Sequence, residues 1–94
     1  MNKYEIMIIV KPDVDEEARN KVLDSFKEIL TEGEGVIDNV TEMGMRDLAY
    51  EIQKYTKGYY VVIDTHTSAA SIAEFDRLSR INTNFLRHLT LRRD

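Results

Sequence analysis

The side chains that most often carry out catalysis or bind metals are scarce in this chain. His66 and His88 are the only histidines, cysteine is absent, and neither histidine has carboxylates at a fixed ligand spacing. Metal sites and nucleophilic catalysis need several such groups together, so surface or hydrogen-bonding roles suit both histidines better. The acids at residues 15–17 would point in different directions on a helix, which does not suit a shared cation site. Their favourable interaction with the positive end of the helix dipole accounts for their presence there. The sequence therefore predicts no enzyme, no catalytic residue, no metal site and no cofactor.

Basic side chains are the other groups that could do chemistry here, because lysine and arginine bind phosphate. The 94 residues carry a net charge of −4, but residues 1–45 have 5 bases against 11 acids, whereas residues 46–94 have 8 bases against 6 acids. A phosphate-binding surface is therefore expected in the second half. Arg77 and Arg80 lie beside acids on a predicted helix and should be ion-paired. The bases that few acids can neutralise, and that we expect to contact phosphate, are Lys54, Lys57, Arg87, Arg92 and Arg93.

The hydrophobic pattern predicts the elements that position these side chains. Runs and alternation of β-branched and apolar residues predict strands at residues 4–10, 36–52, 58–65 and 85–91. Apolar residues at helical spacing predict helices at about residues 15–32 and 68–82. Asp13 or Asp15 would cap the first helix and Ser68 the second. Gly33 suits the left-handed position that closes a helix, Gly44 indicates a bulge in the long strand, and residues 53–57 form a polar turn.

The order of these elements indicates the fold. Strand, helix, two strands, helix and strand in one unit of 94 residues predict an α+β, ferredoxin-like βαββαβ domain that covers residues 1–94. Right-handed crossovers place two helices on one face of a four-stranded antiparallel sheet, with the first and third strands in the middle. No apolar run is long enough to span a membrane and the N-terminus does not resemble a secretory signal, so a cytoplasmic protein is expected.

Strand parity divides the central strands into two faces. The residues expected to face the helices are Tyr4, Ile6, Ile8, Tyr59, Val61 and Ile63. The residues left on the open face are Met7, Ile9, Tyr60 and Val62. The opposite parity would also fit the pattern. Contiguous exposed apolar area marks contact sites, so these four residues are predicted to bind a protein partner.

Other functions are compatible with the same fold. The Tyr59–Tyr60 pair is compatible with an RNA recognition module, but residues 57–62 supply only a fragment of its basic-Gly-aromatic signature. A small, self-associating ligand-binding or regulatory domain would use the open sheet face to form dimers. An acyl-phosphate hydrolase would need an anion-binding loop after the first strand, where residues 11–15 are acidic instead.

Three segments carry a resemblance to a known family. They are residues 4–12, residues 45–54 with Gly58, Tyr59 and Tyr60, and residues 76–82 followed by residues 86–89. In this order and spacing, the segments resemble the bacterial small-subunit ribosomal protein number six family over nearly the whole chain. The resemblance implies a structural protein that binds the central domain, or platform, of small-subunit ribosomal RNA. It also implies a heterodimer with ribosomal protein number eighteen, and a chain that is monomeric when isolated.

The resemblance adds one basic residue to the candidate RNA contacts and shows two departures from the family pattern. Arg46 lies in the second of the three segments and joins the bases predicted to contact ribosomal RNA. Members frequently have a second base after it, whereas this chain has Asp47. Many members also continue into a charged tail beyond the position of Asp94, so partner contact is expected to depend more on the sheet. Because a net charge of −4 repels RNA, binding jointly with a basic partner is expected.

Overall fold

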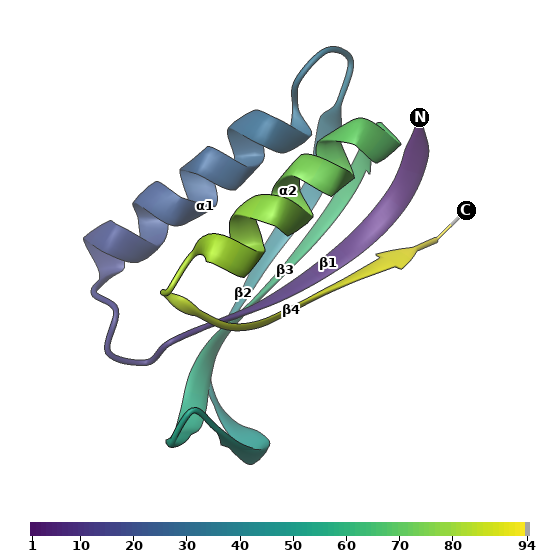
Figure 1. Ribbon diagram of the computed structural model, residues 1–94. Helices are drawn as coiled ribbons and strands as arrows, with labels where there is room; N and C mark the ends of the chain where they lie inside the picture. The colour runs from purple at the N-terminus through teal and green to yellow at the C-terminus, as the bar shows by residue number, and fades with distance from the viewer. Residues whose placement is uncertain (94) are drawn as a thin grey trace.

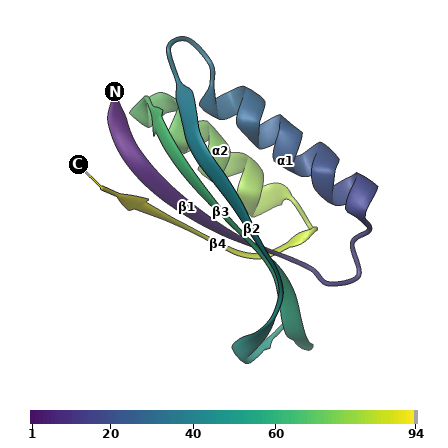
Figure 2. The ribbon, with the colours of Figure 1, turned by 180° about the vertical axis from the view of Figure 1, so that it is seen from behind.

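The computed structural model describes residues 1–93, which form the six predicted elements in the predicted order. They are β1 (Asn2–Val10), α1 (Glu16–Leu30), β2 (Val36–Ile52), β3 (Tyr55–Thr67), α2 (Ala69–Ile81) and β4 (Phe85–Arg92). Within these residues the strands make one antiparallel sheet of order β2-β3-β1-β4. Helices α1 and α2 lie across one face of it (Figure 1), and the opposite view shows the strands from the uncovered side (Figure 2). The predicted ferredoxin-like fold, with β1 and β3 central, is confirmed.

Local capping sets where the helices begin. The Asp15 carboxylate accepts a hydrogen bond from the Ala18 backbone N–H at 2.7 Å, and the Ser68 hydroxyl accepts one from the Ser71 N–H at 3.1 Å. Each satisfies a donor that the first helical turn would otherwise leave unpaired. Helix α1 ends at Leu30, two residues earlier than predicted, because Thr31 takes the C-cap position. Gly33 follows with φ +63°, the left-handed conformation expected for it.

Three phenylalanines from different elements form the centre of the core. The ring of Phe26 on α1 lies edge-on to Phe75 on α2, with centroids 4.7 Å apart, and 5.2 Å from Phe85 on β4. Beneath the helices lie the fully buried side chains of Ile6 and Ile8 in β1. Apolar burial of this kind is the main force that holds the helices on the sheet.

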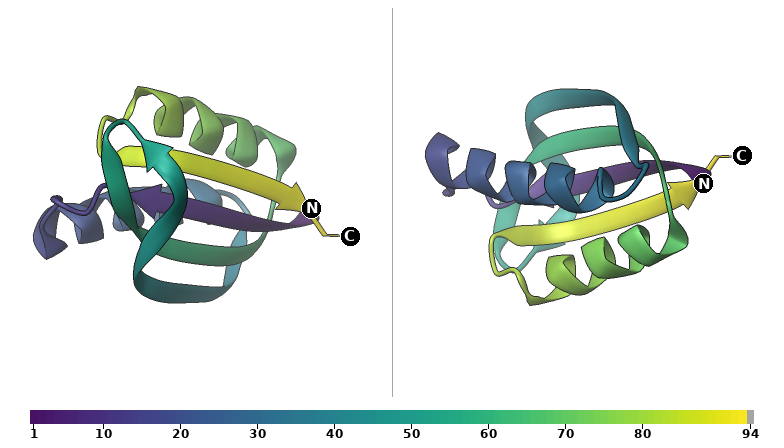
Figure 3. Two further views of the ribbon diagram at one scale, coloured as in Figure 1. Left: turned by 90° about the horizontal axis from the view of Figure 1, so that it is seen from below. Right: turned by 90° about the horizontal axis from the view of Figure 1, so that it is seen from above.

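The β2–β3 hairpin projects beyond the ends of β1 and β4 (Figures 1 and 2), and the end-on views show how strongly its strands twist (Figure 3). Gly44 has φ +82°, and the β2–β3 register shifts between Glu42 and Gly44, so the bulge is confirmed. The predicted turn at residues 53–57 is too long. Ile52 pairs with Tyr55, and the turn consists of Gln53 and Lys54, which have φ +50° and +70°.

Positive φ at both central residues is the geometry of the two-residue hairpin turn that prefers Asn-Gly. Residues other than glycine lose about 1–2 kcal/mol in this conformation. We expect Gln53→Asn with Lys54→Gly to raise the free energy of unfolding by about 1 kcal/mol, since glycine's greater freedom in the unfolded chain offsets part of the gain. Urea denaturation should show a higher midpoint with an unchanged slope. Thr56→Gly, in the adjoining strand, should lower the midpoint. If Gln53→Asn with Lys54→Gly lowered the midpoint as much as Thr56→Gly does, the proposed turn geometry would be contradicted.

Candidate protein and RNA interface

The uncovered face of the sheet carries the apolar residues that strand parity places there. In β1 and β3, Ile6, Ile8, Val61 and Ile63 are fully buried under the helices, which confirms the predicted parity. Met7 lies opposite Val62 in the β1–β3 register. Both side chains are half-buried although no helix lies on their side. The open face therefore presents an apolar centre to its surroundings.

Strand β4 extends this apolar surface with residues beyond the four predicted from the strand pattern. Leu89 lies opposite Met7, and Leu91 lies opposite Glu5, with 43% and 40% of their surface exposed. The sequence pattern that could have identified them is the alternation of Arg87, Leu89 and Leu91, which share one face of the strand. The antiparallel register with β1 places that face on the open side of the sheet. We call Met7, Tyr60, Val62, Leu89 and Leu91 the open-face patch.

A hollow of about 240 Å³ lies where the hairpin meets the open face. One side of it is lined by the part of β2 that lies in the hairpin, through Leu48, Tyr50 and Ile52. The central and edge strands line the other side, through Met7, Ile9, Tyr60 and Leu89. Arg87 at its edge donates a hydrogen bond to the Tyr50 hydroxyl.

Ile9 is only 5% exposed, so it forms the floor of this hollow more than a free surface. Gly58 explains part of that burial, because a Cβ at Gly58 would lie 2.4 Å from the Ile9 Cγ2. A glycine at this position lets the hairpin backbone pass directly over Ile9.

The two adjacent tyrosines of β3 lie on opposite faces of the sheet. Tyr59 faces the helices, where the Arg19 guanidinium lies 3.8 Å from its ring centre and its hydroxyl donates to the Glu42 carboxylate at 3.1 Å. Burial, and then this hydrogen bond, raise the pKa of Tyr59. On the open face, β1 presents Glu5, Met7 and Ile9 rather than an aromatic ring. A base-stacking platform needs aromatics on both central strands, so the RNA recognition module is not built here.

The bases predicted to contact RNA fall into two groups at opposite ends of the sheet. Arg46, Lys54 and Lys57 lie on the hairpin, and all three are exposed. Arg92 and Arg93 lie where β4 ends, close to the N-terminus (Figure 2). The open-face residue Arg87 lies between the two groups on β4. The structure therefore does not bring the predicted RNA-binding residues into one cluster.

The end of β4 is more neutralised than the sequence indicated. The Arg93 guanidinium contacts the Glu5 carboxylate at 2.8 Å, and its backbone N–H bonds the Lys3 carbonyl. Arg92 donates to the Asn2 side-chain oxygen at 2.9 Å. The expectation that few acids neutralise Arg93 was wrong, because antiparallel pairing places β1 beside residues that are distant in sequence. On the hairpin, Lys57 lies in register with Asp47.

Both histidines and the arginines of α2 make the contacts expected of surface residues. His66 lies 2.5 Å from Asp38, and His88 lies 2.7 Å from Asp76. Asp76 also pairs with Arg80 at 2.8 Å. Arg77 holds Glu74 through two hydrogen bonds, which lower the pKa of Glu74 and raise that of Arg77. The predicted ion pairing on α2 is confirmed.

The described residues lack features of some other protein classes. No group of His, Cys, Asp or Glu in residues 1–93 is arranged to hold a metal ion. Nor does that part of the chain contain a helix long and apolar enough to cross a membrane.

Comparison with known proteins agrees with this architecture. The family model described as ribosomal protein S6 matches residues 3–92. The chain is 46% identical to small ribosomal subunit protein bS6 of Halalkalibacterium halodurans, over 95% of this chain and 94% of that protein. The crystal structure of 30S ribosomal protein S6 from Thermotoga maritima superposes with a TM-score of 0.90 at 38% identity, covering 98% of this chain and 87% of that one. The chain therefore belongs to the ribosomal protein S6 family.

Proposed function

We propose that this chain is a non-catalytic, structural component of the small ribosomal subunit. It binds the central domain of the small-subunit ribosomal RNA jointly with ribosomal protein number eighteen, and it acts in the cytoplasm, on the ribosome. Family membership supports the ribosomal role. Joint binding is supported by one observation: in an acidic chain, the apolar open-face patch lies apart from three exposed bases on the hairpin.

The open-face patch supplies the protein contact. Met7, Tyr60 and Val62 lie at its centre, and Leu89 and Leu91 extend it toward the edge strand. A tyrosine among aliphatic side chains is a typical centre for a protein interface, because its ring contributes area while its hydroxyl stays hydrated. Ile9 supports the patch from below rather than touching the partner directly.

Phosphate contacts come mainly from the hairpin. Lys54 lies in the turn, and Arg46 and Lys57 lie on the adjoining strands, so their long side chains extend from an arm that projects beyond the sheet. Arg93 must exchange the Glu5 carboxylate for a phosphate, so it contributes less net binding. Arg87 and Arg92 add secondary contacts on the β4 side.

Joint binding follows from electrostatics. With a net charge of −4, the isolated chain repels a polyanion over most of its surface, and a few lysines gain little against that field. A basic protein bound at the open-face patch gives the pair of proteins a total charge that favours RNA. It also reduces the entropy cost of the second contact, because the two proteins dock as one body.

Charge reversal on the hairpin tests the RNA contact. With protein eighteen present, we expect Lys54→Glu with Lys57→Glu to weaken binding to a central-domain rRNA fragment at least about 100-fold, since two charge-assisted phosphate contacts contribute about 1.5–3 kcal/mol each. Filter binding over a salt series measures both affinity and salt dependence. Lys21→Glu with Lys27→Glu on α1 makes the same charge change away from the hairpin and should cause less than a tenth of that loss. Equal losses in the two double variants would refute a local contact.

The rival function, a self-associating ligand-binding domain, predicts a different solution state. It would pair two open-face patches in a homodimer, whereas the ribosomal role leaves this patch free in the isolated chain. Sedimentation of the pure protein should give a monomer across micromolar concentrations. A tight homodimer, together with absence of the chain from small-subunit fractions of a gradient, would decide for the rival.

A further inference from the structure

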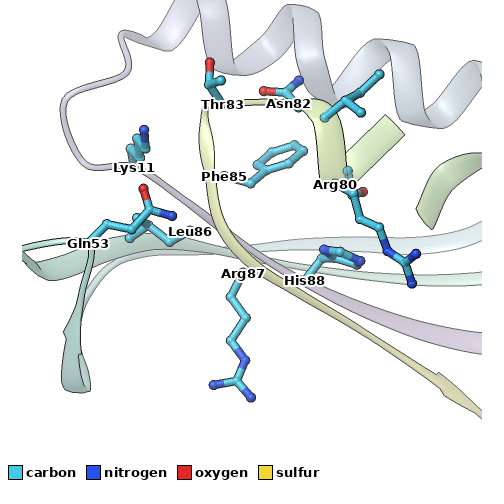
Figure 4. Close-up of a pocket in the computed structure, with 11 residues that line it drawn as sticks. Lys11, Gln53, Arg80, Asn82, Thr83, Phe85, Leu86, Arg87 and His88 are labelled. Carbon is cyan, nitrogen blue, oxygen red and sulfur yellow. The ribbon is translucent and has the colours of Figure 1, made fainter. Parts of the chain in front are cut away.

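A second cavity, separate from the open-face patch, lies between the hairpin and the end of α2. Its volume is about 370 Å³, within the range of small-molecule sites. Lys11 and Gln53 stand on one side of it, and Asn82 and Thr83 stand on the other, above the buried ring of Phe85 (Figure 4). The loop after β1, the hairpin turn, the end of α2 and the start of β4 thus meet at this point.

The charge of this cavity is unusual for so acidic a chain. Among the described residues that line it, Lys11, Arg80 and Arg87 carry positive charge, and none is Asp or Glu. Figure 4 shows the Arg87 side chain pointing away from the other lining side chains. Lys11 is half-buried, with its ammonium 5.9 Å from the Tyr55 ring centre. It is the cation best placed to meet a ligand.

The nearby acids are already engaged. Asp76 pairs with both Arg80 and His88, and Asp13 accepts a hydrogen bond from the Tyr55 hydroxyl at 2.9 Å. That hydrogen bond raises the pKa of Tyr55. Neither carboxylate forms an ion pair with Lys11 within the described residues.

The opposite wall supplies hydrogen-bonding side chains. Asn82 and Thr83 line it just after α2 ends at Ile81. A side-chain amide and a hydroxyl can each donate to and accept from the edge of a base, while Lys11 suits a phosphate.

We propose that this cavity receives one unpaired nucleotide of the ribosomal RNA, with its phosphate against Lys11 and its base edge against the end of α2. Unstacked bases held in protein pockets are a common mode of RNA recognition. The site continues the basic hairpin, because Lys54 follows Gln53 directly in the turn. This inference rests on the proposed function, since the RNA must first be bound.

Salt dependence tests the phosphate contact. In the complex with protein eighteen, Lys11→Gln should weaken binding to the central-domain rRNA fragment about tenfold, as expected for one charge-assisted contact. It should also reduce the slope of log K against log salt by about 0.7–0.9. Lys21→Gln, on the exposed side of α1, makes the same charge change and should leave both quantities nearly unchanged.

Tethered cleavage tests the position of the nucleotide independently of charge. The chain has no cysteine, so a single introduced cysteine can carry an iron–EDTA group without background. Attached at Thr83→Cys, beside the cavity, this group should cleave the rRNA at one short segment that contains an unpaired nucleotide. Attached at Asn20→Cys, on the exposed side of α1, it should cleave weakly or not at all.

The outcomes distinguish the two proposals. If the unmodified pair of proteins fails to bind the rRNA, the proposed function fails. If the pair binds but Lys11→Gln behaves as Lys21→Gln does, or cleavage from Thr83→Cys is no stronger than from Asn20→Cys, the joint function stands and the nucleotide site is wrong. Cleavage confined to double-stranded RNA would also overturn the proposal.

Discussion

Val62→Asp is expected to reduce the affinity of this protein for its proposed partner, ribosomal protein eighteen, by at least about 100-fold, because truncating or mispairing a buried interface charge costs roughly 2–5 kcal/mol. Val62 lies at the centre of the open-face patch, opposite Met7. A carboxylate there would lose water on docking without gaining a partner. Isothermal titration of the two proteins measures the loss directly.

The fold should survive this substitution, because Val62 is half-buried on the uncovered side and a carboxylate in the isolated chain stays hydrated. Ala69→Asp is the matched control. It adds the same charge at an exposed position in the first turn of α2, where an acid is tolerated. Unchanged affinity in a folded Val62→Asp protein would show that the partner docks elsewhere.

Phe26→Ala is expected to have the largest effect on stability, lowering the free energy of unfolding by about 3–5 kcal/mol. Phe26 is 2% exposed and touches Phe75 and Phe85, so its removal leaves a cavity where α1, α2 and β4 meet. For a chain of this size each kcal/mol lowers the melting temperature by about 4–8 °C. Urea denaturation and thermal unfolding measure the change.

Phe26→Leu provides the control, since it keeps most of the apolar volume and should cost clearly less than the alanine variant. The leucine variant should fold and bind protein eighteen normally, because Phe26 lies in the layer of the helices and not on the open face. Equal destabilisation by leucine and alanine would mean that aromatic contact, and not filled volume, dominates at this position.

Together the two substitutions separate the functions of the two faces of the sheet. The helix-covered face holds the buried residues that stabilise the fold, such as Ile6, Ile8 and Val61. The uncovered face holds apolar residues that the fold leaves partly exposed. Folding and docking at the open face can therefore be perturbed independently.

Local pattern was sufficient for most of the architecture. Ser68 caps α2 as predicted, Asp15 is the one of the two predicted candidates that caps α1, and Gly33 and Gly44 adopt positive φ at the predicted helix end and bulge. Alternation also divided β1 and β3 into two faces, but the packing of the helices decided which face is buried. These features depend on interactions between residues a few positions apart, so the sequence contains the information directly.

Tertiary structure decided how the candidate site is assembled. Arg93 is paired with Glu5 because β4 lies beside β1, and Ile9 is covered because the hairpin backbone passes over it at Gly58. The cavity at Lys11 exists because the hairpin turn comes close to the end of α2. Alternation and helical spacing determined the elements and which residues share a face of each strand. The contacts among charged and exposed residues depended on strand register and turn geometry, which join residues far apart in the chain and leave no local pattern.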